Sequence, residues 1–225
     1  MEMIPLYLSV KIASIATSFV FITAVFIARI MVHRSFPGKM VLESTFMLPL
    51  VLPPTVVGFG LLFLFGKNGW LGKWLWEWFG IQLVFTWWAA VIASIVVSFP
   101  LMYQSAVAAF KTVDTNLENA ARTMGSSEWK VFWTITFPLG WPGLLAGLVL
   151  TFARALGEFG ATLMFAGFIP GKTETIPLAI YFAVERGSTA LAMYWVMIII
   201  SMGFAAMMWL NWWSKRNMDR HRIEG

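Results

Sequence analysis

The stretch from Leu6 to Ile30, LYLSVKIASIATSFVFITAVFIARI, decides the class of fold. It carries only two charged side chains, Lys11 and Arg29, and it is longer than the roughly 20 apolar residues that cross a bilayer as a helix. The residues before it are acidic rather than basic, and no small-residue cleavage pattern follows it. The stretch therefore predicts a membrane anchor and not a cleaved signal peptide.

Four more runs of this kind follow, so the sequence predicts five membrane-spanning helices; the other four are Thr45–Phe65, Leu83–Val107, Gly143–Phe165 and Leu191–Trp213. The whole chain is 59% hydrophobic and 12% charged, whereas a soluble domain is about 25% charged. A soluble protein of this size could not cover so much apolar surface. We expect an all-α polytopic membrane protein in which residues 1–225 form one domain without an internal repeat.

The distribution of lysine and arginine predicts the orientation in the membrane. Ten of these residues lie near the ends of spans one, three and five, on one side: Arg29, Arg34, Lys39, Lys111, Arg122, Lys130, Lys215, Arg216, Arg220 and Arg222. The other side carries five: Lys11, Lys67, Lys73, Lys172 and Arg186. Because cytoplasmic loops are enriched in basic residues, we expect the N-terminus outside and the C-terminus in the cytoplasm. A basic tail that binds nucleic acid is the alternative explanation, but we expect no nucleic-acid partner.

The residue types exclude most catalytic chemistry. The chain has no cysteine, and its two histidines, His33 and His221, both lie in basic segments outside the predicted spans. We therefore expect no catalytic residue, metal site or cofactor. The segment 166–173, AGFIPGKT, resembles a phosphate-binding loop, but it follows a membrane helix instead of a strand. If the protein is driven by ATP, another subunit must bind the nucleotide.

The loop between spans three and four contains a predicted short helix. Residues 115–118, TNLE, have the pattern of a capping box, in which Thr115 and Glu118 satisfy free backbone donors at a helix start. The helix should continue to Met124, and Gly125 should supply a left-handed cap. A second helix, Glu128–Phe137, should begin after Ser126 or Ser127 and end before Pro138. A helix lying at the lipid headgroups would show the same pattern.

Spans two and four contain residues that are unusual inside a membrane. Pro49, Pro53 and Pro54 should kink or break span two, because proline lacks an amide hydrogen and clashes with the preceding turn. A broken helix is tolerated at this depth where protein or a water-filled path covers it, so residues 48–58 should face the bundle interior or a path. A simple packing kink is the alternative.

Span four carries Arg154 and Glu158, four residues apart. Each charge would cost at least about 2.5 kcal/mol at the bilayer centre if it faced lipid, so both should face inward and pair. The pair could clamp spans or subunits together, or Arg154 could add positive potential to a path for an anion. A transport path also needs two facing halves, and one five-span chain supplies one of them. The sequence therefore predicts a dimer.

The predicted loop helix resembles the EAA loop of bacterial ABC importer permeases. The match comprises Asn119-Ala120-Ala121, Gly125, Ile135 and Pro138 at the family spacing, with Asn119 in place of Glu and Phe137 in place of Leu. The resemblance implies a coupling helix at about 115–125 that docks into an ATP-binding subunit. The residues that it implies for this contact are Glu118, Asn119, Ala120, Ala121, Arg122, Gly125, Ile135 and Pro138.

Longer stretches resemble the molybdate importer permeases: Phe36–Lys39, Leu48–Gly58, Phe152–Thr162 and Ile169–Tyr181. Sulfate permeases share the pattern ARALGE at 153–158, so a sulfate or thiosulfate importer is the first alternative. The resemblance implies a type I importer fold in a bacterial inner membrane. It also implies a cytoplasmic ATPase dimer, and a periplasmic or extracellular binding protein that docks on the outer loops Gly66–Gln82 and Gly167–Ala190.

Two other functional classes compete with this interpretation. An ion channel or ion-driven carrier would need carboxylates at mid-membrane, where Glu158 stands beside Arg154. An intramembrane enzyme would need a nucleophile with a base, or a metal cluster, inside a span.

Overall fold

The computed structural model describes the backbone of residues 3–223 and the side chains of residues 3–213. Helices account for the regular structure in these residues, and no strand occurs among them. In chain order they are α1 (Ile4–His33), α2 (Lys39–Val51), α3 (Pro54–Phe65), α4 (Trp70–Phe79), α5 (Trp87–Lys111), α6 (Thr115–Thr123), α7 (Glu128–Val131), η1, a π-helix (Phe132–Thr136), α8 (Phe137–Leu156), α9 (Gly160–Phe165), α10 (Ile176–Glu185) and α11 (Thr189–Ile223). The side chains of the basic tail, including His221, lie outside the described residues.

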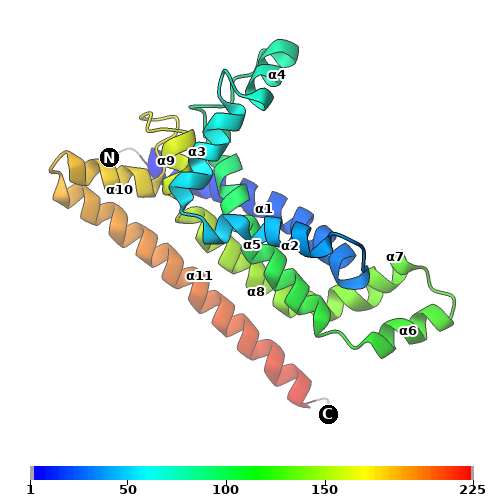
Figure 1. Ribbon diagram of the computed structural model, residues 1–225. Coiled ribbons are helices and arrows are strands. Elements are labelled where there is room, and N and C mark those ends of the chain that lie inside the picture. The colour runs from blue at the N-terminus through cyan, green and yellow to red at the C-terminus, as the bar shows by residue number, and fades with distance from the viewer. Residues whose placement is uncertain (1–2, 224–225) are drawn as a thin grey trace.

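Four helical stretches are long and apolar enough to cross a membrane: Ile4–His33, Trp87–Lys111, Glu128–Leu156 and Thr189–Trp213. The bent pair α2–α3 makes a fifth if it is counted as one span. The prediction of an all-α protein with about five spans is therefore confirmed (Figure 1). The loops that follow α1 and α5 lie at the end of the bundle where the chain terminates, and α4 and α10 lie at the other end.

The predicted break in span two is confirmed. Pro49 is accommodated within α2, and the chain breaks at Leu52 and Pro53, which have extended backbones. The direction of the helix axis changes by 114° from one half-helix to the other. Pro54 begins α3, where a missing amide hydrogen costs nothing because the first turn of a helix has no acceptor for it. The consecutive prolines thus end one helix and start the next.

The predicted bounds of span four are wrong at both ends. A continuous helical stretch runs from Glu128 to Leu156, so Pro138 does not end a helix. The wider π-helical turn of η1 ends two residues before Pro138 and lets the chain continue past this residue, which cannot donate a hydrogen bond. At the other end the helix stops at Leu156, and α9 begins separately at Gly160. Span four therefore also has a break, near the end that lies away from α6.

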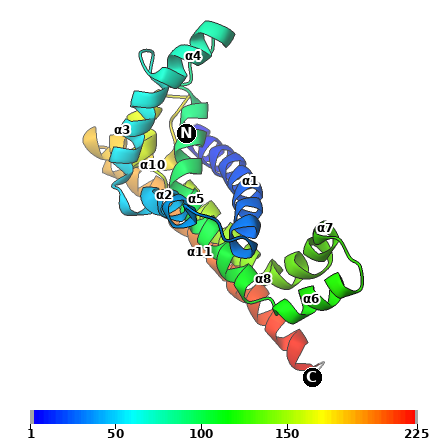
Figure 2. The same cartoon turned by 45° about the vertical axis from the view of Figure 1, so that its right-hand side comes forward.

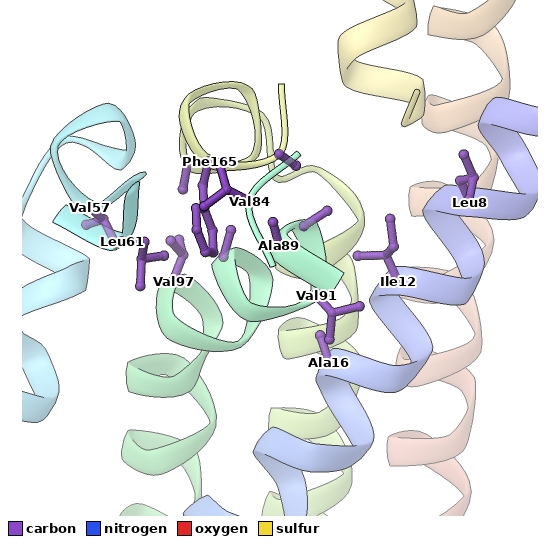
Figure 3. Close-up of a cluster of buried hydrophobic side chains, with 14 residues drawn as sticks. Leu8, Ile12, Ala16, Val57, Leu61, Val84, Ala89, Val91, Val97 and Phe165 are labelled. Atoms are coloured by element: carbon purple, nitrogen blue, oxygen red, sulfur yellow. The ribbon is translucent and has the colours of Figure 1, made fainter. Parts of the chain in front are cut away.

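The helices pack closely around α5. Helix α1 lies along it, and its contact face is small: Ala16, Ala24 and Ala28 are fully buried. Small residues let helix backbones approach in a membrane, where hydrophobicity alone does not drive association. At the upper end, α3, α5 and α9 meet in a cluster that includes Leu61, Val97 and Phe165 (Figure 3). This cluster fixes the two broken helices against a continuous one.

Helix α6 and α7, the first turn of the long stretch that leads into α8, together project from the bundle as an arm. Figure 2 shows this arm beside the end of α1 and on the same side as the C-terminus. The arm connects α5 to α8 along the chain.

Candidate functional site

Helix α6 is capped at both ends, but the predicted capping box is wrong. Asp114 is the N-cap, and its carboxylate accepts a hydrogen bond from the Asn116 amide at 2.8 Å. Thr115 is already inside the helix. At the other end Gly125 has a φ of +84°, its amide donates to the Arg122 carbonyl, and the next amide donates to the Ala121 carbonyl. This Schellman arrangement confirms the left-handed glycine cap.

Glu118 points into the protein and does not cap the helix. Its side chain is 4% exposed, and one carboxylate oxygen lies 3.0 Å from His33 Nε2 at the end of α1. The other oxygen accepts a hydrogen bond from the Thr136 hydroxyl in η1. Arg122 Nη2 lies 3.3 Å from the same carboxylate. One carboxylate therefore joins α6 to α1 and to the helical stretch that leads into α8.

Arg122 extends these contacts to α7. Its Nε donates to the Glu128 carboxylate at 2.6 Å, and its Nη1 donates to the Asn119 side-chain oxygen at 2.9 Å. Arg29 of α1 donates to the Glu128 carbonyl at 2.6 Å. We refer to His33, Glu118, Arg122, Glu128 and Thr136 as the polar cluster. Its members come from α1, α6, α7 and η1, and its hydrogen bonds and ion pairs hold the arm in place.

The surroundings of Glu118 and Arg122 favour the charged forms of these two side chains. Burial by itself would raise the pKa of Glu118, but the Thr136 hydrogen bond, His33 and Arg122 together lower it below its ordinary value. The hydrogen bond to Glu128 is the main reason that the pKa of Arg122 is raised. A cleft of about 760 Å³ lies between α1 and the arm beside these groups, lined by Phe26, Arg34 and Trp129 as well as by the polar cluster. The arm is thus joined to α1 by polar contacts beside this cleft.

A second region brings the two broken helices together. Gly58 of α3 lies so close to α9 that a Cβ on it would be 2.7 Å from Ala161 Cα. Gly160 lies against Pro54 in the same way, with a corresponding distance of 3.0 Å to the proline Cβ. We refer to this contact between α3 and α9 as the crossing.

Arg154 and Glu158 lie next to the crossing and form the predicted pair. Arg154 Nη1 is 2.7 Å from one oxygen of Glu158, whose side chain is 2% exposed. The other oxygen accepts the Ala161 amide at 2.8 Å, so Glu158 also satisfies a free donor at the start of α9. The Arg154 side chain is 33% exposed. The buried acid is therefore doubly bound, and the base keeps part of its surface free.

Comparison with known proteins identifies the family. Residues 12–218 match the family described as binding-protein-dependent transport system inner membrane component. The chain belongs to this family. It is 51% identical over 208 residues to a putative molybdenum transport system permease protein, YvgM, of Bacillus subtilis (strain 168), covering 92% of this chain and 91% of that one. It is 44% identical over 214 residues to the molybdenum transport system permease protein ModB of Escherichia coli (strain K12), covering 95% and 93%.

A sulfate permease and a solved transporter are also similar to this permease. The sulfate transport system permease protein CysW of Synechococcus elongatus is 40% identical over 161 residues, which are 71% of this chain and 56% of that one. A crystal structure of a bacterial ABC transporter involved in alginate import matches with a TM-score of 0.76 at 15% identity, covering 95% of this chain and 79% of that one. The structural match shows that the fold is that of a type I importer permease.

The structure places the predicted coupling residues of the permease differently with respect to the polar cluster. Glu118 and Arg122 lie inside the polar cluster, and Asn119 binds Arg122 at its edge. Ala120 is exposed, whereas Ala121 is 6% exposed and packs inward, so of these two implied contact residues only Ala120 lies on the surface of the chain. Helical spacing places Ala121 on the side of Glu118, three residues away. Ile135 and Pro138 lie in and just after η1, beside the cluster but outside its hydrogen bonds.

Residues 48–58 of span two were predicted to face the bundle interior or a path, but most of them are exposed within one chain. Leu48, Leu50, Val51 and Val56 are about half exposed or more, whereas Val57 and Gly58 are buried at the crossing. Within one chain, most of the residues in 48–56 are therefore exposed.

Three residues that hold α6 in place were not predicted as such from the sequence: two belong to the polar cluster, and the third is the N-cap Asp114. His33 is 85 residues from Glu118 in the sequence, and nothing local marks it as a partner. Thr136 lies between Ile135 and Phe137, in a stretch whose sequence is typical of an ordinary membrane helix. Asp114 did carry a signal, because aspartate is among the best N-cap residues, but the Thr-x-x-Glu pattern that starts one residue later masked it.

Proposed function

We propose that this permease is the membrane subunit of an ATP-driven importer of a tetrahedral oxyanion, and that the oxyanion is molybdate. Residues 1–225 form one permease domain with a coupling helix at about 115–125. The observation that supports this proposal most strongly is the sequence identity of 44–51% to proteins named molybdenum permeases, over more than nine tenths of both chains. The sulfate permease matches a smaller share at lower identity, so sulfate is the second candidate.

The polar cluster supports a coupling role for α6. A docking helix has to present one face to its partner and hold the other to its own subunit. Helix α6 does both: Leu117, Ala120 and Met124 are exposed, and Glu118 and Ala121 are buried. A push on the exposed face by an ATPase would pass through Glu118 to His33 of α1 and Thr136 of η1. The arm would transmit movement as a unit because α6 is capped at both ends.

This role can be tested at Ala120. Ala120→Trp adds a large group to the exposed face, so we expect it to block docking of the ATPase while leaving the permease folded. Ala120→Ser is the matched control and should behave as the unchanged protein. Normal stimulation of ATP hydrolysis in the Ala120→Trp transporter would place the coupling contact elsewhere. The variant Ala121→Trp is not a test of docking, because the Ala121 side chain is buried.

The exposed break in span two supports a homodimer. Pro49, Pro53 and Pro54 lack amide hydrogens, so the carbonyls four residues before them lose their helical donors. Such groups need protein or water around them at bilayer depth. We propose that spans two to five of two copies surround the path and that α2–α3 faces it. Because the chain has no cysteine, Thr55→Cys can be cross-linked in native membranes. Cross-linked dimers are expected, and recovery of monomers alone would contradict the arrangement.

Arg154 and Glu158 act mainly as a clamp in this proposal. Glu158 holds the start of α9 through Ala161 and the end of α8 through Arg154. Glu158→Gln keeps the shape and removes the charge, so it should loosen the junction of α8 and α9. We expect a lower melting temperature for the purified permease. An unchanged melting temperature together with altered anion selectivity would favour a direct role in the path.

The loops at the end away from α6 are proposed to face outside and to receive the binding protein. They carry both signs of charge: Lys67, Lys73, Lys172 and Arg186 against Glu77, Glu174 and Glu185. Such charges steer association and are sensitive to salt. Reversal of Lys172 and Arg186 should slow docking at low salt more than at high salt. Equal docking rates at both salt concentrations would contradict this assignment.

The decisive experiment for the whole proposal is reconstitution. The permease is assembled with the ATPase and the binding protein from the same organism in lipid vesicles. Molybdate-loaded binding protein should raise ATP hydrolysis and drive uptake of radioactive molybdate, and an excess of sulfate should leave uptake unchanged. Uptake that sulfate inhibits as strongly as unlabelled molybdate would favour the second candidate. Uptake without ATP would overturn the proposal.

A further inference from the structure

Helix α4 has an aromatic surface that the proposed transport function does not use. Four of its ten residues are tryptophan, and the chain has 13 in all, so α4 is strongly enriched. Trp70 is 80% exposed and Trp78 is 74% exposed, and Trp74 between them is also exposed. Residues 70, 74 and 78 follow one another at four-residue spacing, so they form a continuous stripe along one side of the helix.

The charged residues of α4 form one narrow strip next to this stripe. Lys73 and Glu77 lie one turn apart, and Lys73 Nζ is 3.7 Å from the Glu77 carboxylate. The rest of the helix is Trp, Leu, Phe and Gly. A helix with one polar strip and an otherwise aromatic surface is typical of a helix that lies in a membrane interface. Tryptophan is also the residue that is most characteristic of that layer.

The position of α4 in the chain places it at the edge of the bilayer. It lies between the end of α3 at Phe65 and the start of α5 at Trp87. Phe59 and Phe63 of α3 are exposed, so an apolar surface leads along the membrane half-helix towards Trp70. Trp87 receives Lys11 over its ring, with 3.8 Å from Nζ to the ring centroid. An aromatic group beside a lysine near the end of a span is typical of the interfacial layer.

Helix α4 is also held firmly to α3. Gly72 is so close to the end of α3 that a Cβ on it would be 2.1 Å from the Gly66 carbonyl oxygen. Gly69 is similarly close to the carbonyls of Phe63 and Leu64. Gly80 ends the helix in a left-handed cap. Because backbone packs against backbone here, α4 and α3 move as one body, although α4 projects from the rest of the bundle (Figure 1).

We infer that α4 lies in the lipid headgroup and upper acyl layer, on the bilayer side away from α6, and anchors α3 there. Trp70, Trp74 and Trp78 enter the lipid, and the Lys73–Glu77 strip faces water. The partner of this surface is the phospholipid bilayer. The anchor holds the outer end of the broken span two at a fixed depth, and the inference does not depend on which solute is transported.

Spin labelling tests the inference, because the chain has no cysteine to remove. Single cysteines replace Trp74, Trp78, Lys73 or Glu77 in the full chain, which is reconstituted in vesicles of phosphatidylethanolamine and phosphatidylglycerol. Each label is probed with oxygen, which concentrates in lipid, and with a neutral nickel chelate, which stays in water. Lys73→Cys and Trp74→Cys are matched neighbours that differ in the face they occupy.

We expect oxygen to dominate relaxation at positions 74 and 78 and nickel to dominate at 73 and 77, so the depth parameter changes sign around the helix. Dominance of nickel at all four positions would overturn the inference and indicate a surface in water. Labels at 74 and 78 that are immobile and shielded from both reagents would also overturn it, and would indicate that protein covers the stripe. If one tryptophan variant does not fold, the other still decides between these outcomes.

Discussion

The polar cluster and the crossing both join helices that are far apart in the sequence, but they do so by opposite means. The polar cluster uses long charged side chains that reach across a hollow, with one buried carboxylate at the centre. The crossing relies on missing side chains: Gly58 and Gly160 let α3 and α9 meet backbone to backbone.

The difference matches the surroundings of the two regions. Burying polar groups at bilayer depth has a high free-energy cost. Close packing of small residues joins the broken helices there without that cost. At the aqueous end, polar contacts can be broken and remade with water as a substitute partner. We therefore expect the crossing to be rigid and the polar cluster to be the joint that moves, and four changes of decreasing effect test this contrast.

The largest effect is expected at the crossing. Gly58→Ala places a Cβ within 3 Å of Ala161 backbone atoms and of Met164 Cβ, and the backbone atoms cannot move aside alone. Overpacking of this kind costs about 1–3 kcal/mol, so the melting temperature of the purified permease should fall. Gly60→Ala on the same helix is the matched control, because nothing lies within 4 Å of its Cβ position. Equal melting temperatures for the two variants would show that the crossing is not tightly packed.

The second effect is expected in the polar cluster. Glu118→Gln keeps the size of the side chain but removes the charge that binds His33 and Arg122. We expect a local loss of about 1–2 kcal/mol, which corresponds to roughly 5- to 30-fold faster amide exchange in α6. Glu77→Gln, which breaks the exposed pair with Lys73, should leave α6 exchange unchanged. A fall in the melting temperature as large as that of Gly58→Ala would mean that the polar cluster is part of the rigid framework.

A smaller effect is expected at the end of α6. Gly125→Ala meets no neighbouring atom, so its cost comes only from the left-handed backbone and amounts to about 1 kcal/mol. Exchange at the last turn of α6 should increase by a few fold, with little change in overall stability. Gly125→Asn should recover part of the loss, because asparagine adopts this conformation more readily. Identical exchange in the alanine and asparagine variants would argue against the cap.

The smallest effect concerns pH. Because the pKa of Glu118 is lowered in the folded protein, its contribution to stability is fully present above about 4.5 and is lost as the pH falls through the lowered value. The infrared band of its protonated carboxyl, taken as the difference from Glu118→Gln, should therefore titrate below 4.5. A midpoint above this value would show that burial outweighs the partners of the carboxylate.

The sequence alone determined the features that depend on local composition and on a single residue's chemistry. Runs of about 20 apolar residues gave the spans, consecutive prolines gave the break after α2, and Gly125 gave the left-handed cap. Two opposite charges four residues apart gave the Arg154–Glu158 pair, because neither could face lipid alone. Each of these follows from the cost of an exposed backbone group, a strained φ or an unpaired charge.

Only the tertiary structure decided which distant elements meet. Glu118 has a local capping pattern, yet His33 and Thr136 draw its carboxylate inward, because several donors in one buried place satisfy it better than one backbone amide does. The continuity of the helix past Pro138 depends on a π-helical turn that the sequence around η1 does not predict. The contact of Gly58 with Ala161 depends on two breaks, in α2–α3 and in α8–α9, occurring at the same depth. Contacts of this kind join residues far apart in the chain, and the local energetics that the sequence reports carry no information about them.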